Sequence, residues 1–180
     1  MPNLKDSVHE LQSRTLGSPL GAIHLAAVTG RLCSLTIAVR EPLAEVSLGK
    51  QTGEDSPSGM TNNQVLDIAE QQLGEYFAGD RKVFDIPLLL GGTRFQQSIW
   101  ARLAEIPFGS TSSYGELARA IGSPQAARAV GGAVGANPIP IVIGCHRILS
   151  SNRALTGYSG GNGLDTKRWL LQHEAIEWRN

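Results

Sequence analysis

Cys145 and His146 stand next to each other, one residue after the apolar residues 141–143. A cysteine attacks carbon as its thiolate, and a neighbouring histidine can take up the thiol proton. Glu174 carries a carboxylate that could orient His146 if the fold brings the two together. These three residue types suit a Cys-His-carboxylate relay that activates a nucleophilic cysteine, although on spacing alone an inert buried cysteine is an equally good interpretation.

The charged residues near Cys145 favour the reactive interpretation. His146, Arg147 and Arg153 are close in sequence, and positive surroundings stabilise a thiolate. The other cysteine, Cys33, lies in a strand-like apolar run and is expected in the core. Two cysteines are too few for a disulfide framework or a cysteine-rich zinc site.

A run of small residues over 126–136 contains one long charged side chain, Arg128. Its three glycines would each cost a helix about 1 kcal/mol relative to alanine, so a smooth surface must serve a purpose there. That purpose is close approach to a neighbouring helix or to a DNA strand. Arg128 is accordingly either an ordinary exposed arginine or a probe that enters a DNA groove.

Charge is distributed unevenly along the 180 residues. Residues 1–90 carry 7 Lys and Arg against 11 Asp and Glu, whereas residues 91–180 carry 9 against 5. A cationic second half fits a nucleic-acid surface there, or is ordinary scatter in a neutral protein. The chain lacks an apolar stretch long enough to span a membrane and an apolar segment typical of a secretory signal. We therefore expect a soluble protein of a reducing compartment.

The elements that would position these residues fall into two domains, 1–90 and 91–180. The first is expected to be a small α/β domain with a sheet, and glycines 91 and 92 mark its end. Thr61 and Gln64 have the spacing of a helical capping box. The predicted elements are strands over 22–28, 32–39 and 85–90, a loop over 44–63 and a helix over 61–77.

The second domain is predicted to be mainly helical. Ser113 and Glu116 form another capping-box pattern, and Ser123 followed by Pro124 suits the start of the next helix. Two helices joined by a glycine-containing turn are typical of a helix-turn-helix. The predicted elements are helices over 95–106, 113–121, 124–136 and 165–175, with a glycine-rich loop over 155–163.

Three segments carry a resemblance to a known family. They read FQQSIWARLAEIPFGSTSSYGELARAIG, PQAARAVGGAVGANPIPIVIGCHRI, and LTGYSGG followed by KRWLLQHE. The stretch from Phe95 to Glu174 thereby resembles the O6-alkylguanine-DNA alkyltransferases. The resemblance implies a winged helix-turn-helix, and a methylated-DNA–[protein]-cysteine S-methyltransferase activity. The alkyl group of O6-alkylguanine, and also of O4-alkylthymine, would move irreversibly to Cys145, once per molecule, after minor-groove binding and nucleotide flipping.

The same resemblance implies roles for individual residues. His146 would activate Cys145 through a water and be polarised by Glu174, while Tyr114 would protonate the departing guanine at N3. Asn137 would brace the helix-turn-helix against the active-site segment, and Arg128 would take the place of the flipped base. Further DNA contacts are implied for Ser113, Ala127, Ala129, Gly131 and Gly132, and a guanine pocket for Ile143, Gly144, Leu155, Tyr158 and Ser159.

Gly144 departs from the family pattern, which has proline before the cysteine. Glycine leaves that turn freer, so we expect slower transfer, and Gly144→Pro should then raise the rate. Three other functions stay open: a damage sensor that does not repair, a thiol hydrolase of small substrates, and a winged-helix transcription factor. The presence of Cys145 argues against a damage sensor. A thiol hydrolase of small substrates does not predict the helix of small residues that bears Arg128.

The partner implied is double-stranded alkylated DNA, with no membrane. The chain is expected to be a monomer in the cytoplasm (or in the nucleus of a eukaryote), with cooperative binding along DNA left open. No cofactor is implied. Because Cys33, His9 and His24 are the only cysteine and histidines of the first half, a structural zinc is not expected there.

Overall fold

The computed structural model describes residues 10–38 and 59–179. It divides into two compact units, Met1–Gly91 and Gly92–Asn180. His9 and most of the loop predicted over 44–63 lie outside the described residues.

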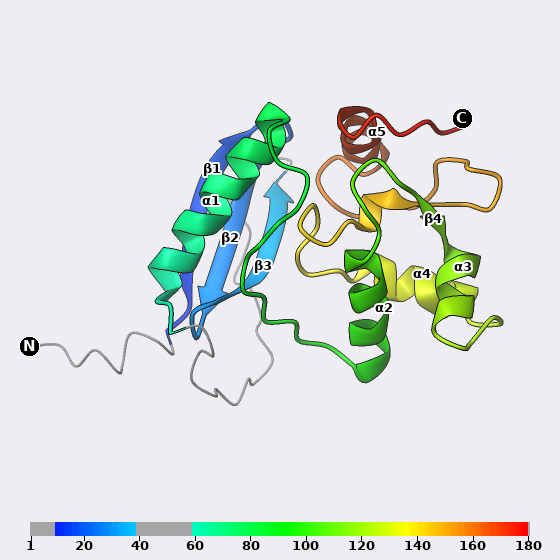
Figure 1. The fold of residues 1–180 in the computed structure, drawn as a ribbon, viewed down its shortest axis with the longest axis horizontal. Coiled ribbons are helices and arrows are strands. Elements are labelled where there is room, and N and C mark those ends of the chain that lie inside the picture. Colours follow the sequence, from blue (N-terminus) through cyan, green and yellow to red (C-terminus); the bar gives the residue numbers. More distant parts are fainter. Residues whose placement is uncertain (1–9, 39–58, 180) are drawn as a thin grey trace, which may run out of the picture. The chain divides into compact units, whose positions relative to one another are not determined.

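The first unit holds a three-stranded antiparallel sheet with one helix against it (Figure 1). The strands β1 (Gln12–Ser18), β2 (Gly21–Val28) and β3 (Arg31–Ala38) lie side by side in that order. The predicted hairpin is β2 and β3. Sequence reasoning missed β1, because none of its residues is buried and its mostly polar sequence lacks the alternation that marks a strand.

Helix α1 (Asn62–Ala78) starts with the predicted capping box, in which Thr61 and Gln64 bond each other's backbone N–H groups. The strand predicted over 85–90 is wrong. Only Leu88 forms a bridge, to Leu32, and Pro87 beside it has no N–H with which to extend the pairing. Helix and sheet share a core of Ile23, Leu25, Leu32, Leu35, Val65, Leu66, Ala69, Leu73 and Tyr76.

The second unit is mainly helical, as predicted, with α2 (Arg94–Ala104), α3 (Tyr114–Ala120), α4 (Ala127–Gly135) and α5 (Leu164–His173). Two very short strands of this unit, β4 (Ser112–Ser113) and β5 (Ile148–Leu149), pair with each other in parallel (Figure 1). Ser113 pairs with Leu149, so this bridge brings the start of α3 beside the segment that follows Cys145. The pairing thus brings together residues 112–113 and 148–149, which are far apart in the sequence.

Helix α4 starts later than predicted. Ser123 does not cap it; instead the N–H of Ala126 bonds the carbonyl of Ser123 at 2.9 Å in a separate turn, and the helix begins at Ala127 with no side-chain cap. Trp100 on α2 fixes the other end, because its Nε1 donates to the carbonyl of Ala133 at 2.8 Å in the core. The small residues of α4 thus pack against α2 on one face and leave the other exposed.

Candidate active site

Cys145 begins a single 3-10 turn, η1 (Cys145–Arg147), that follows an apolar segment. Its N–H donates to the carbonyl of Ile143 at 2.7 Å, which closes a tight turn around Gly144. The side-chain amide of Asn137 donates to the same carbonyl at 2.8 Å, while its oxygen accepts the N–H of Ile139 at 3.0 Å. Asn137, two residues after α4, therefore fixes the backbone from which Cys145 projects.

His146 is the candidate base of the site. Its Nε2 lies 2.8 Å from Oε1 of Glu174, and both side chains are completely buried. An ionised carboxylate only accepts hydrogen bonds, so Nε2 carries the hydrogen and Nδ1 carries the lone pair. Nδ1 is buried with no hydrogen-bond partner among the described residues. Burial lowers the pKa of His146 in spite of Glu174, so the ring stays neutral and Nδ1 can accept a proton.

Arg147 secures the carboxylate. Its Nε donates to Oε2 of Glu174 and its Nη2 to Oε1, both at 2.9 Å, and its Nη1 bonds the carbonyl of Ile106 at 2.7 Å. The N–H of Gly109 also bonds Oε2, at 3.3 Å. Burial alone would raise the pKa of Glu174, but the hydrogen bonds from His146 and Arg147 outweigh it and hold that pKa well below its usual range. Sequence reasoning treated Arg147 only as part of a positive environment.

The expected thiolate at Cys145 is corrected by this arrangement. The charge of Arg147 is engaged by Glu174, His146 is neutral, and Arg153 is exposed with its Nη2 on the carbonyl of Glu177. Cys145 itself is 6% exposed. Burial raises the pKa of its thiol, and Asn137, Lys167 and Tyr158 only partly oppose this. The resting sulfur is therefore a thiol that needs a base.

Lys167 is a buried residue of this site that sequence reasoning missed. Its ammonium donates to the carbonyls of Ile148 at 2.6 Å and Thr156 at 2.7 Å, and burial lowers its pKa to about 8. Its positive charge acts on Cys145 and opposes the rise in the pKa of that thiol caused by burial. A signal existed in the sequence: Lys167 precedes Leu170 and Leu171 by three and four positions, on the apolar face of the helix.

Tyr114 is the first residue of α3, directly after β4. Its hydroxyl is hydrogen-bonded to Thr156, and a Cβ at Gly157 would lie 3.6 Å from it. A Cβ at Gly131 of α4 would lie 3.8 Å from its ring. Burial raises the pKa of Tyr114, with Cys145 as a further cause in the same direction. The phenol thus keeps its proton.

The other residues expected at a guanine pocket have different surroundings. Ile143 and Gly144 are buried in the turn before Cys145, and Oγ of Ser159 bonds the carbonyl of Gly135 at 3.0 Å. Leu155 is half-buried and packs against a hydrophobic cluster of Leu149, Leu171 and Ile176.

The exposed face of α4 contains the residues expected to contact DNA. Ala127, Arg128, Ala129 and Gly132 are exposed, and Gly131 is half-buried against Tyr114. Ser113 has a structural role as well, because its Oγ accepts the N–H of Glu116 at 3.2 Å and so caps α3.

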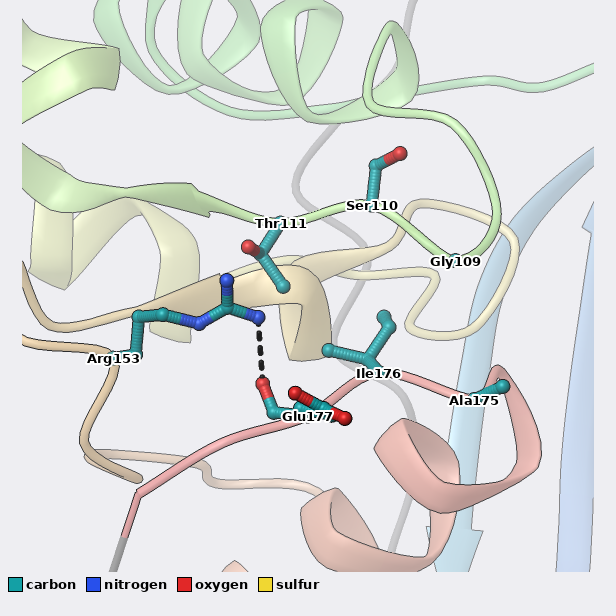
Figure 2. A pocket seen from close by; sticks show the side chains of 7 residues that line it. All are labelled: Gly109, Ser110, Thr111, Arg153, Ala175, Ile176 and Glu177. Carbon is teal, nitrogen blue, oxygen red and sulfur yellow. Dashed lines mark hydrogen bonds between the residues drawn. The ribbon is translucent and has the colours of Figure 1, made fainter.

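An open polar pocket of about 470 Å³ is lined in part by residues 175–177, which follow Glu174 in the chain (Figure 2). Gly109, which lines this pocket, donates its N–H to Oε2 of Glu174. Ala175, which also lines it, is the residue after Glu174. None of the residues expected to do chemistry lines it. Its lining is Gly109, Ser110, Thr111, Arg153, Ala175, Ile176 and Glu177.

Within residues 10–38 and 59–179, no three His, Cys, Asp or Glu side chains gather as a metal site would require. The helices of the same described ranges are too short or too polar to cross a membrane.

Both units match known protein families. Residues 4–90 match the ribonuclease-like domain of 6-O-methylguanine DNA methyltransferase, and residues 94–176 match its DNA-binding domain. A methylated-DNA–protein-cysteine methyltransferase of Mycolicibacterium paratuberculosis is 46% identical over 172 residues, or 94% of each chain. The constitutive protein of that name from Bacillus subtilis is 41% identical over 165 residues, which cover 92% of this chain and 96% of the relative.

Solved structures agree. A crystal structure of Mycobacterium tuberculosis O6-methylguanine methyltransferase superposes with a TM-score of 0.73 at 42% identity, covering 92% of this chain and 93% of the other. Another, of Mycobacterium tuberculosis OGT in complex with DNA, gives 0.72 at 42% identity, with 90% and 91% covered. With both family domains in order along the chain and relatives that match it almost from end to end, this protein belongs to the 6-O-methylguanine DNA methyltransferase family.

Proposed function

We propose that this chain repairs DNA by moving the alkyl group of O6-alkylguanine to Sγ of Cys145, once per molecule. The observation that carries the proposal is the buried pair of Glu174 and His146, the residue directly after Cys145, with Nδ1 of His146 left to accept a proton. Membership of the family supports the same reaction. O4-alkylthymine presents an alkyl carbon on a similar ring oxygen and is a second substrate.

The reaction begins with the thiol, because burial keeps Cys145 protonated. Nδ1 of His146 takes the proton through a water, and Glu174 stabilises the imidazolium that forms. The thiolate attacks the alkyl carbon; the S–C bond forms as the C–O6 bond breaks, and its electron pair leaves with guanine. Tyr114 donates its hydroxyl proton to N3 of the departing base, and the imidazolium proton restores the phenol.

The product explains why each molecule acts once. A thioether has no easy leaving group, so the alkyl carbon stays on Cys145 and the thiol is not regenerated. Lys167 contributes in this scheme by favouring the thiolate during the attack, since its field already opposes the rise in the pKa of Cys145.

An alkyl carbon stacked inside a duplex is out of reach, so the nucleotide must rotate out of the helix. The exposed face of α4 suits this step, since its alanines and glycines allow close approach to a minor groove. Arg128 fills the gap in the base stack. Gly144, Tyr158 and Ser159 receive the guanine near Cys145, and Asn137 holds the turn between them and α4.

This reaction requires double-stranded alkylated DNA as the binding partner of the chain. It takes place in the cytoplasm of a bacterium or in the nucleus of a eukaryote. A monomer suffices, because the proposed chemical groups all belong to one unit.

The test is to mix the protein with a duplex carrying one O6-methylguanine and to measure the mass of the intact protein. We expect a gain of one methylene in proportion to lesion consumed, lost in Cys145→Ser and kept in Cys33→Ser. Tight lesion binding without the gain would indicate a damage sensor. Turnover of small thioesters without DNA would indicate a hydrolase, and duplex binding that ignores the lesion a transcription factor.

A further inference from the structure

Thr156, in the loop between β5 and α5, meets Tyr114 at the start of α3 through a hydrogen bond between the two side-chain hydroxyls. Tyr114 is half-buried, whereas Thr156 is exposed. The hydroxyl of an exposed threonine can bond water instead, so the burial of polar groups does not require this contact. The proposed reaction uses Tyr114 as a proton donor and has so far given Thr156 no part.

The backbone of Thr156 is held in place although its side chain is exposed. Its carbonyl accepts a hydrogen bond of 2.7 Å from the ammonium of Lys167, which is fully buried and also donates to the carbonyl of Ile148 at 2.6 Å. The next residue, Gly157, has a φ of 41°, in the left-handed region that favours glycine. A Cβ at Gly157 would lie 3.6 Å from the hydroxyl of Tyr114, so the chain turns directly beside the phenol. The contact between Thr156 and Tyr114 is therefore built on a fixed backbone.

We propose that Thr156 is a positioning residue of the transfer reaction: its hydroxyl donates to the oxygen of Tyr114, so that the phenol hydrogen is left for N3 of the departing guanine. This inference rests on the proposed function. It concerns how the leaving base receives its proton, not which group is transferred or which atom accepts it.

The chemistry of proton donation explains why a second hydroxyl is useful. As the O–H bond of Tyr114 breaks and the N3–H bond forms, negative charge develops on the phenol oxygen. A hydrogen bond to a charged oxygen is roughly twice as strong as one to a neutral oxygen, so Thr156 acts most strongly in the transition state. Burial raises the pKa of Tyr114 and weakens it as an acid, and the hydrogen bond to Thr156 opposes that rise.

The first experiment measures single-turnover transfer from a duplex with one O6-methylguanine by the full chain and by two variants. Thr156→Val keeps the shape and removes the hydroxyl, and it should slow transfer by roughly three- to tenfold, the effect of one hydrogen bond. Thr156→Ser keeps the hydroxyl and should restore the wild-type rate to within about twofold. Thr36→Val, on β3 of the first unit, is the matched control and should leave the rate unchanged.

The second experiment separates protonation of the leaving base from the attack by sulfur. Iodoacetamide alkylates the same Cys145, but its iodide leaves with the electron pair and needs no proton. Thr156→Val should therefore react with iodoacetamide at the wild-type rate. In the Tyr114→Phe background, where no phenol hydrogen remains to be directed, Thr156→Val should add almost nothing to the loss of transfer from DNA.

The outcomes are distinguishable. A wild type that gains no methylene overturns the proposed function, and this inference with it. If the wild type transfers, three results overturn the role of Thr156 alone: an unchanged rate in Thr156→Val, equal slowing with DNA and iodoacetamide, or equal slowing with and without the hydroxyl of Tyr114. Should Thr156→Val fail to fold, as shown by its tryptophan fluorescence, Thr156→Ala replaces it in each comparison.

Discussion

Nε2 of His146 donates a hydrogen bond of 2.8 Å to Oε1 of Glu174, and both side chains are completely buried. The pair therefore works in a low-dielectric interior, where an unpaired charge is costly and a hydrogen bond fixes orientation strongly. The same carboxylate also binds Arg147, so Glu174 joins His146 to a buried cation.

Replacing Glu174 with glutamine tests this junction. The amide keeps the shape but removes the charge that stabilises the imidazolium and pairs Arg147. We expect single-turnover transfer to fall by roughly 10² and the unfolding free energy to fall by about 3 kcal/mol, because a buried arginine loses its partner. The mass of the intact protein in samples quenched at successive times gives the transfer rate. Urea unfolding gives the free energy of unfolding. Glu177→Gln, an exposed neighbour, is the control and should change neither.

The second unit should lose stability as the pH falls from about 7 to 4. The pKa of His146 is lowered in the folded state, so below its unfolded value of about 6.5 the unfolded chain binds more protons. The pKa of Glu174 is lowered too, so its contribution is present above about pH 4.3 and is lost below it. Both effects have the same sign.

Urea unfolding at several pH values measures this loss. All 3 tryptophans lie between residues 100 and 178, so their fluorescence reports on the second unit alone. In Glu174→Gln the fall below about pH 4.3 should be shallower, since the lowered carboxyl pKa is absent. A wild-type midpoint that stays constant from pH 7 to 4 would contradict the prediction.

Lys167→Met should slow transfer without preventing duplex binding. The change removes the positive charge that favours the thiolate of Cys145, and it leaves the carbonyls of Ile148 and Thr156 without their donor. We expect a slower single-turnover rate and a thiol that reacts with iodoacetamide only at higher pH. Lys82→Met, in the other unit, is the control. Equal iodoacetamide pH profiles for wild type and Lys167→Met would refute the electrostatic role.

Arg128→Ala should weaken reaction with duplex DNA and spare reaction with the free base O6-methylguanine. Arg128 is exposed on α4 among alanines, and its proposed role exists only when a base has left the stack. Arg102→Ala removes an exposed arginine from α2 and serves as the control. Equal losses for the duplex and the free base would place Arg128 in the chemistry or the fold instead of the groove.

Local features of the fold could be predicted from the sequence because their causes are local. The capping boxes at Thr61 and Ser113 and the apolar faces of α1 and α2 follow from residues three or four positions apart, and the structure confirms them. The predicted start of α4 was wrong because the carbonyl of Ser123 accepts the N–H of Ala126 in a separate turn before the helix. The β1 strand was missed because an edge strand need not bury a face.

The sequence by itself determined the chemical groups: a cysteine followed by a histidine, a carboxylate near the end of the chain, and a helix of small residues with one arginine. Tertiary structure alone decided their states. Burial keeps Cys145 a thiol. The guanidinium of Arg147 binds the carboxylate of Glu174, 27 positions away, and the same carboxylate accepts a hydrogen bond from His146. Spacing along the chain carries no information on these states, because desolvation and hydrogen bonding depend on which distant segments pack together.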